Sequence, residues 1–365
     1  MPIFMDRHDV SENVSAELLA QIHQEDLKIE HEYGCRGFTY WFDERRQNAF
    51  CLIEAPNKAA IESMHRHAHG DVPNTIIEVE PTIVESFLGR ISDPEKSENT
   101  QLNIIKDSAH RILMTVKNLR IINNQDSNIT QSISTHFETA INNLIKEQEG
   151  NIVNNTSHSY LISFKSADKA INTALKIENE LRPKYTDASS QIKIGIASGD
   201  PVTDKPQIFE ETIILTTRLS EVINSAINIS FEVKTLYENE QRHPISAKHE
   251  IRVLSPSEET FLTQVMDEIE NTWQNPEFNI DRFSDNLGFS KSQLYRKLKA
   301  LTGKSPNTFI RDYRLDRALK LINNQKGNIS EIAFETGFNS LAYFSKCFKN
   351  KYNTIPSQYA QQKKP

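Results

Sequence analysis

The sequence lacks the features that mark several classes of protein. Only three of its 365 residues are cysteines, Cys35, Cys51 and Cys347, and they are widely spaced and odd in number. This pattern excludes a disulfide framework and a CxxC metal or redox motif. No run approaches the roughly 18 apolar residues needed to span a bilayer, and the start MPIFMDRHDV has no basic segment followed by an apolar one. We therefore expect a cytoplasmic protein without a membrane partner.

What the sequence contains is an ordinary globular composition with an uneven charge. Hydrophobic residues make up 37% and charged residues 25% of the chain, and at roughly 100 to 200 residues per domain its length predicts two or three domains. The net charge is −7, but residues 275–365 carry 16 Lys+Arg against 7 Asp+Glu, a balance of +9 that leaves −16 for the rest. A basic C-terminal part behind an acidic body indicates that one part alone binds a polyanion.

Residues 1–85 show an alternating strand and helix pattern. Strands are expected at Pro2–Asp6, Phe38–Phe42, Ala49–Glu54 and Thr75–Val79, and helices at Ala16–Tyr33 and Lys58–His67. This β-α-β-β-α-β order predicts a ferredoxin-like α+β sandwich. The polar segment Gly89–Asn103, which contains Pro94, is typical of a linker.

Residues 104–254 predict a second α+β sandwich. Strands are expected at Ile112–Val116, Ser159–Phe164, Ile192–Ala197 and Ile227–Phe231, and helices at Ser132–Lys146, Ala167–Leu181 and Glu211–Ser225. The segment Ser255–Glu259 contains Pro256 and indicates a boundary. A helix from about Thr260 to Trp273 then leads into an all-α domain over residues 260–365.

The first of two helix-turn-helix patterns lies in Asn279–Gly303. Gly288 supplies the turn, and Ser290 is a suitable N-cap for the second helix. The spacing of Leu294, Leu298 and Leu301 places these side chains on one inward face. The outward face then offers cationic and hydrogen-bonding groups to DNA, from Lys291, Ser292, Gln293, Tyr295, Arg296 and Lys299.

The pattern recurs in Asn328–Tyr352. Gly337 takes the turn, Asn339 is expected to cap, and Phe344 and Phe348 face inward. The outward residues expected to contact DNA are Asn339, Ser340, Ala342, Ser345, Lys346 and Lys349. An amphipathic helix over Pro306–Asn323 would join the two motifs, so that one chain reaches two successive major grooves about 34 Å apart.

Both motifs, their spacing and the phrases FSKCFKNKY and IPSQY resemble the AraC/XylS family of transcriptional regulators over residues 262–360. The resemblance implies double-stranded DNA as the partner, with Lys291–Leu301 and Ser340–Asn350 as recognition helices. Lys346 stands where the family often has Arg, and since Lys makes no bidentate contact with guanine, we expect it to contact phosphate. A basic helical bundle that binds no DNA is the alternative.

Histidines are concentrated near the start of the chain. Six of the 11, at positions 8, 23, 31, 65, 67 and 69, lie in the first 85 residues. His65 and His69 are four residues apart on an expected helix, and His23 and Asp26 are three apart on another, so each pair shares a face. Imidazole and carboxylate groups of this kind could converge on a metal.

The runs FMDRHD, HQEDL, GFTYWFDE, FCLIEAPN and MHRHAHG resemble a small bacterial family of ferredoxin-like proteins, some of which bind nickel. The resemblance implies His8, His23, His65 and His69 as metal ligands, with Asp26 as a further candidate. Imidazole also suits zinc, copper and iron, so the resemblance implies nickel or another divalent transition metal as the cofactor. The alternative is that these histidines are surface or packing residues.

The middle phrases SYLISFKSADKAINTALKIENEL, IKIGIASGDPV and ETIILTTRLSEV resemble the catalytic domain of class III nucleotide cyclases. In that family two acidic residues hold the catalytic metals, yet Met114–Lys117 and Thr156–Ser159 contain no carboxylate. Ile214 stands where the family has an asparagine that acts in the transition state, while Arg218 matches the family's arginine. We expect an inactive cyclase-like domain for dimerisation or ligand sensing, with an unrelated αβ sandwich as the alternative.

Taken together, these patterns predict a multidomain DNA-binding transcription regulator that is not an enzyme. We expect a homodimer whose N-terminal domains sense a metal or small-molecule effector. Two other functions stay open: a nucleotide cyclase with a DNA-binding domain, and a metal-binding or storage protein.

Overall fold

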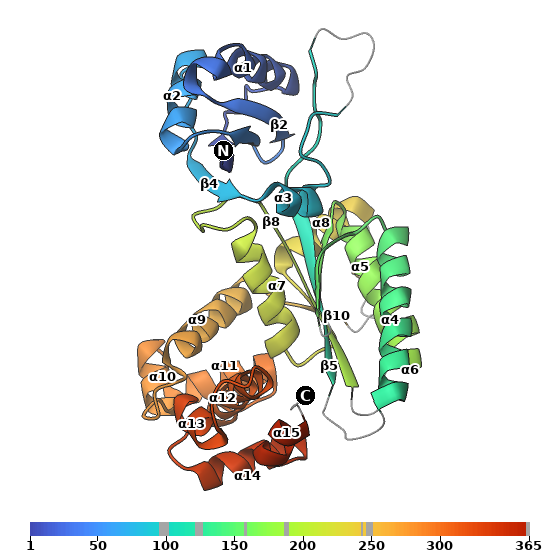
Figure 1. Ribbon diagram of the computed structural model, residues 1–365, viewed down its shortest axis with the longest axis vertical. Helices are drawn as coiled ribbons and strands as arrows, with labels where there is room; N and C mark the ends of the chain where they lie inside the picture. Colours follow the sequence, from blue (N-terminus) through green and yellow to red (C-terminus); the bar gives the residue numbers. More distant parts are fainter. Residues whose placement is uncertain are drawn as a thin grey trace.

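A computed structural model describes residues 1–94, 102–120, 127–156, 159–185, 190–241, 244–245 and 251–362. Two sheet-containing regions are followed by an all-helical region, so the chain is multidomain (Figure 1). Among the helices in these ranges, none combines the length and the apolar character needed to cross a membrane.

The N-terminal region has the predicted β-α-β-β-α-β order. Its elements are β1 (Ile3–Asp9), α1 (Ala16–Ile29), a 3-10 turn (Glu30–Tyr33), β2 (Arg36–Asp43), β3 (Asn48–Glu54), α2 (Lys58–Ala68) and β4 (Thr75–Val79). The strands pair antiparallel in the order β2-β3-β1-β4. Ser15 and Asn57 begin the two helices, because their side chains accept hydrogen bonds from the amides of Leu18 and Ala60.

The two faces of this sheet are both covered. Phe4 packs in the core beneath α1 and α2, whereas the next residue, Met5, packs in a core shared with the middle region. Asp6 and His8 therefore lie on the helix-covered face, because side chains alternate along a strand. The other face meets α3 (Pro81–Leu88), a helix that the sequence did not predict and that lies at the junction with the middle region (Figure 1).

The predicted linker is packed at both of its described ends. The guanidinium of Arg90 lies 4.3 Å from the ring centroid of Trp41. The amide of Ile105 donates to the hydroxyl of Tyr40 at 3.0 Å, and the Ile105 side chain is buried in the N-terminal core. Residues 95–101 of this segment lie outside the described residues. The segment between the N-terminal and middle regions therefore packs against the N-terminal region on both sides of residues 95–101.

The middle region is a six-stranded sheet in the order β10-β9-β8-β5-β7-β6. The strands are β5 (Arg111–Arg120), β6 (Asn151–Thr156), β7 (Ser159–Phe164), β8 (Ser190–Gly199), β9 (Ile227–Ile229) and β10 (Ile251–Val253). The helices are α4 (Ser127–Glu147), α5 (Ala167–Lys176), a π turn (Ile177–Leu181), α6 (Arg182–Tyr185), α7 (Glu210–Val222) and α8 (Phe231–Gln241). The predicted strands and helices are confirmed, with the predicted ends at β7 and shifted ends elsewhere, while β6, α6, α8 and β10 were not predicted.

Helix α7 covers one face of this sheet, opposite the core formed with α4, α5 and α8. It approaches closely at Gly195, where an added Cβ would lie 2.1 Å from the carbonyl oxygen of Thr216. Glycine is therefore required there. The buried Thr115 hydroxyl of β5 donates to the hydroxyl of Thr216, also across this face.

The C-terminal region begins with α9 (Pro256–Thr272). Ser255 is its N-cap and forms a capping box with Glu258. The proposed boundary Ser255–Glu259 is therefore the start of a helix, and Pro256 occupies its first turn, where proline fits well. The remaining helices are α10 (Ile280–Asn286), α11 (Lys291–Thr302), α12 (Pro306–Asn323), α13 (Ile329–Glu335), α14 (Leu341–Tyr352) and α15 (Pro356–Gln362).

A continuous core joins the middle region to the first helix-turn-helix unit. Leu219 of α7 and its C-cap residue Ile223 share it with Leu262 of α9 and with Leu294 and Leu298 of α11. All five side chains are fully buried. The second helix-turn-helix unit has a separate core with α12. The first unit is therefore held rigidly on the middle region.

Candidate metal centre and nucleic-acid interface

A cavity of about 290 Å³ lies beneath α1 and α2, on the helix-covered face of the N-terminal sheet. All five predicted ligands line it: His8, His23, Asp26, His65 and His69. His23 and Asp26 come from α1, His65 lies in the last turn of α2, and His69 is the C-cap residue of that helix. His8 comes from β1. The fold thus gathers groups that are far apart in the sequence.

Three of these residues are in direct contact. Nδ1 of His65 lies 3.1 Å from Oδ1 of Asp26 and 3.0 Å from Nε2 of His69, and Nε2 of His69 lies 3.3 Å from the same Asp26 oxygen. Because the ligand atoms are within reach of one another, these three residues form a compact cluster that could hold a metal.

Asp6 is a fully buried member of the site that sequence reasoning missed. Its Oδ2 lies 3.1 Å from Nε2 of His65, and its Oδ1 accepts a hydrogen bond from the amide of Cys51 at 2.9 Å. Burial by itself raises the pKa of this carboxyl, but His8 and His65 hold it well below its usual range. The run FMDRHD contained the signal, because Asp6 and His8 are two residues apart and so share a face of a strand. The predicted strand stopped at Asp6 rather than Asp9, so the shared face of Asp6 and His8 was not recognised.

His65 lies between two carboxylates, Asp6 and Asp26. Burial opposes its charged form, yet the hydrogen bonds to Asp26 and Asp6 outweigh burial and raise the pKa of His65 to about 10. His23 behaves in the opposite way, because burial lowers its pKa. Its ring lies 4.9 Å from the ring of Tyr40. His23 therefore tends to be neutral, which is the form that binds a metal.

His8 provides a test of whether the site fits a metal. The residue is only 6% exposed, and within the described chain its Nε2 has no hydrogen-bond partner. A buried polar atom without a partner costs about 1 to 3 kcal/mol, which coordination would recover. Imidazole nitrogens and carboxylate oxygens are suitable ligands for late first-row divalent metals. The residues present therefore fit such an ion, which His65 would bind after releasing its proton.

The first recognition helix, α11, presents most of the predicted residues to solvent. Lys291, Ser292, Tyr295, Arg296 and Lys299 are exposed, whereas the three predicted inward leucines are buried. Gln293 has a second role, because its side chain accepts a hydrogen bond from the Ser290 amide at 3.0 Å and completes a capping box. Lys291 also pairs with Asp281 at 2.6 Å. Tyr295 and Arg296 are exposed and take no part in this capping box or ion pair.

The second recognition helix, α14, begins one residue later than predicted. Ser340 is its N-cap and accepts from the amide of Tyr343, so the prediction that Asn339 caps the helix was wrong. Ser340 fits because a serine hydroxyl at this position satisfies an otherwise unpaired amide. Phe344 and Phe348 are buried as predicted. The predicted residues Asn339, Ser340, Ala342, Lys346 and Lys349 are exposed, and Ser345 is half-buried.

Sequence reasoning missed two exposed side chains on α14. Leu341 is 39% and Tyr343 is 51% exposed. Neither residue was named among the outward residues of this helix, although both lie in the first turn after the N-cap Ser340 and are exposed. Such side chains could contact the methyl group of thymine or the sugar backbone.

The positions that resemble a cyclase site have structural roles here. Met114 and Val116 are buried in the middle core. Arg218 is also buried, and it donates to Asp267 at 2.6 Å and to Glu270 at 2.9 Å, both on α9. Ile214 is half-buried on α7, and residues 157–158 of the resembling hairpin lie outside the described residues. Arg218 therefore connects two regions of the chain.

Two families of known proteins match this chain. Residues 4–79 match a family described as nickel responsive protein SCO4226-like, and residues 283–362 match a family described as a helix-turn-helix domain. A crystal structure of SCO4226 from Streptomyces coelicolor A3(2) is 31% identical and covers 21% of this chain and 94% of that one, with a TM-score of 0.20.

Curated relatives match over shorter shares of their own length. A protein named histidine kinase P4 from Formosa agariphila is 34% identical over 205 residues, which are 51% of this chain and 15% of that protein. The HTH-type transcriptional regulator MtrA from Neisseria gonorrhoeae is 32% identical over 28% of this chain and 32% of its own. The chain thus spans about a third or less of these two relatives.

Proposed function

Because the chain carries an AraC-type helix-turn-helix domain behind a SCO4226-like domain, we propose that it is a DNA-binding transcription regulator that responds to a divalent transition metal. Nickel is the first candidate, since the family matched by residues 4–79 is described as nickel responsive. The N-terminal region would then be a ferredoxin-like sensor, consistent with its β-α-β-β-α-β order.

The proposed DNA contacts rest on exposure and charge. Arg296 is exposed on α11 and is suited to a bidentate contact with guanine. Lys346 and Lys349 are exposed on α14 and are suited to phosphate. The balance of +9 over residues 275–365 adds a favourable long-range attraction to DNA.

The observation that carries the metal proposal is the cavity that four histidines and Asp26 line together, with the buried Nε2 of His8 unpaired within the described chain. His8, His23, Asp26, His65 and His69 are the residues that would hold the ion. A bound ion would supply a link between β1, α1 and α2. Those elements otherwise meet through hydrogen bonds and apolar contacts.

Packed contacts connect this cavity with the DNA-binding helices. Arg7 neighbours His8 on β1 and donates to the carbonyl of Val202 in the middle region. Val202 and Phe209 are buried in the core shared with the N-terminal sheet, and Phe209 immediately precedes α7. Helix α7 in turn shares a core with α11. Metal binding can alter DNA affinity only to the extent that the two states of the protein differ in metal affinity.

The middle region would serve as the connection between sensor and reader. We propose that it is a cyclase-like fold without the cyclase reaction, because Thr115 and Arg218 are engaged in buried contacts with α7 and α9. A homodimer remains a prediction. The rival function, a nucleotide cyclase under control of a DNA-binding domain, would require metal carboxylates that Met114–Lys117 does not contain.

Calorimetry on the full chain tests the sensor. We expect the metal-free protein to bind Ni²⁺ more tightly than about 10 µM, and His65→Ala combined with His69→Ala to weaken this binding strongly. His31→Ala is the matched control, because His31 is an exposed histidine of the same region outside the cavity. If the double variant binds Ni²⁺ as the control does, the site as proposed does not exist.

A further inference from the structure

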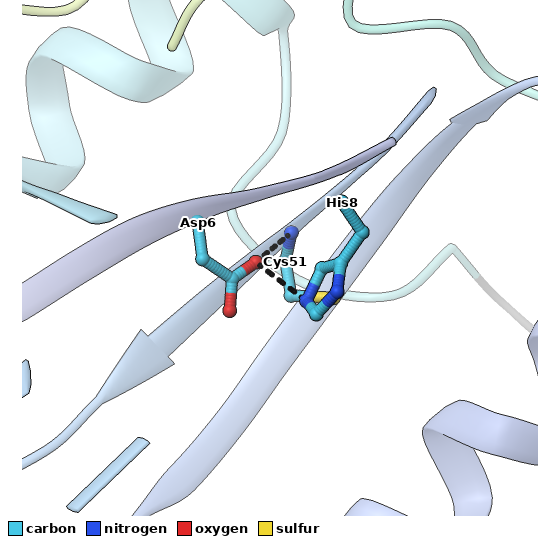
Figure 2. Close-up of side chains that lie close together, drawn as sticks. All are labelled: Asp6, His8 and Cys51. Atoms are coloured by element: carbon cyan, nitrogen blue, oxygen red, sulfur yellow. Dashed lines mark hydrogen bonds and ion pairs between the residues drawn. The ribbon is translucent and has the colours of Figure 1, made fainter. Parts of the chain in front are cut away.

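A second set of metal-ligating side chains lies on the sheet beneath the histidines. Asp6 and His8 project from β1, and Cys51 projects from β3, where it pairs directly with Asp6 in the strand register. One ligand atom from each of the three residues lies within 4.8 Å of the others. Figure 2 shows the three side chains pointing toward one another, with the Asp6 carboxylate between the Cys51 amide and the His8 ring.

The spacing within this set is close to that of a metal site. At bond lengths of about 2.0 to 2.3 Å, ligand atoms of a tetrahedral ion lie roughly 3.3 to 3.8 Å apart. Nε2 of His8 and Oδ1 of Asp6 are already separated by 3.7 Å. The sulfur of Cys51 therefore has to move toward the other two ligand atoms by about an ångström at most. A side-chain adjustment can provide this movement.

His8 is the residue whose unpaired nitrogen points to a ligand here. Its ring is buried, and within the described chain Nε2 is left without a hydrogen bond although it faces a carboxylate. The other nitrogen, Nδ1, lies 3.8 Å from the carboxylate of Asp71. An ion between His8, Asp6 and Cys51 would satisfy the unpaired nitrogen and the acidic oxygen together.

Cys51 is accessible to an ion despite its burial. The thiol is not in a disulfide and lines the same cavity as the histidines. Cys35 provides a contrast within the same core, because it is also free and buried but lies near the backbone carbonyl of Tyr33 and does not line the cavity.

We propose that Asp6, His8 and Cys51 form a sulfur-containing site for a thiophilic divalent ion, beside the cluster of Asp26, His65 and His69 in the same cavity, and that His8 serves this site rather than that cluster. The inference rests on the proposed metal-binding function of this domain and adds a thiolate to its ligands. On binding, the Cys51 thiol releases its proton to solvent, a sulfur–metal bond forms, and no oxidation takes place. Thiolate ligation selects against Mg²⁺, Ca²⁺ and Mn²⁺, which prefer oxygen.

Cobalt is the probe for this site, since a Co²⁺–thiolate bond gives a charge-transfer absorption in the near ultraviolet that imidazole and carboxylate ligands do not. Metal-free full-length protein is titrated with Co²⁺ and compared with Cys51→Ser, Cys35→Ser, and Asp26→Asn combined with His69→Gln. We expect the band in the parent, in Cys35→Ser and in the double variant, and its loss in Cys51→Ser. His8→Gln should weaken the Co²⁺ affinity of the band at least about tenfold.

The outcomes separate this inference from the function on which it rests. Co²⁺ binding without a thiolate band in the parent overturns the sulfur site but leaves a histidine site intact. No Co²⁺ binding at all overturns both. A band that survives in Cys51→Ser also overturns the inference. Should Cys51→Ser fail to fold by circular dichroism, Asp6→Asn replaces it, and an unchanged band and affinity in that variant contradict the proposed ligand set.

Discussion

The guanidinium of Arg218 on α7 donates to the carboxylates of Asp267 and Glu270 on α9, at 2.6 Å and 2.9 Å. The arginine is only 6% exposed. The class III cyclases that the middle region resembles have a catalytic arginine at this position. Here Arg218 connects the middle region, through hydrogen bonds, to the helix that precedes the first helix-turn-helix unit. This contact makes the stability of the two regions interdependent.

Replacing Arg218 should therefore destabilise the region around α7 and α9. We expect Arg218→Ala to cost about 1.5 to 3 kcal/mol, the range for hydrogen bonds to charged groups. The loss should not exceed this range, because Asp267 and Glu270 are exposed enough to be hydrated when the arginine is removed. The midpoint of urea unfolding measures the loss. Lys234→Ala is the control, since Lys234 pairs with Glu238 one turn along α8, where both side chains are partly exposed, and it should cost at most about 1 kcal/mol. Equal midpoints for the two variants would contradict the assigned role.

The two turn glycines should respond differently to alanine. Both have positive φ, +78° at Gly337 and +69° at Gly288. An added Cβ at Gly337 would lie 2.5 Å from the carbonyl oxygen of Trp273, while at Gly288 it meets nothing within 4 Å. Gly288→Ala should cost about 1 to 2 kcal/mol from the backbone alone, and Gly337→Ala clearly more. Thermal unfolding of both variants checks the order, and a smaller loss at Gly337 would show that this packing is wrong.

Specificity for DNA should depend on Arg296 and affinity on Lys349. Arg296→Ala is expected to lose about 1 to 3 kcal/mol on a selected operator and to relax the preference at one base. Lys349→Ala should weaken binding to every sequence alike. It should also make the slope of log binding constant against log salt concentration shallower by about one. Lys205→Ala, in an exposed loop of the middle region, is the control. Binding by both variants at the level of this control would refute the proposed interface.

No cyclic nucleotide should be formed. Purified protein given ATP or GTP with Mg²⁺ or Mn²⁺ is expected to yield neither cyclic product, because Met114–Lys117 provides no carboxylate to hold the metals. Chromatography of the reaction mixture measures this. A cyclic product that disappears in Arg218→Ala would favour the enzyme instead.

The sequence predicted well what depends on local pattern. The strands Thr75–Val79 and Ser159–Phe164 have the predicted ends, and the leucines of α11 and the phenylalanines of α14 are buried as their spacing indicated. The histidines and Asp26 were selected by enrichment and resemblance. That they line one cavity is visible only in the folded structure.

What the sequence could not predict depends on contacts between distant segments. Asp6 and Cys51 become neighbours only through the register of β1 with β3. Helix α3 does carry local signals, Pro81 at its first position and Gly89 with positive φ at its end, but it is short, and its stability depends on packing between two sheets. Arg111 illustrates this, since its buried guanidinium donates to the carbonyls of Phe87 and Leu88 at the end of α3. Local patterns carry no information about such partners.

The central claim, that a metal in the N-terminal cavity controls DNA binding, is tested most directly by operator affinity with and without metal. A DNA site is first selected with the full-length protein, and its dissociation constant is then measured at fixed salt for metal-free and Ni²⁺-loaded protein, for the parent and for His65→Ala combined with His69→Ala. We predict a shift of about fivefold or more in the parent and none in the double variant. Identical affinities for the metal-free and loaded parent, with Ni²⁺ shown to be bound, would contradict the claim.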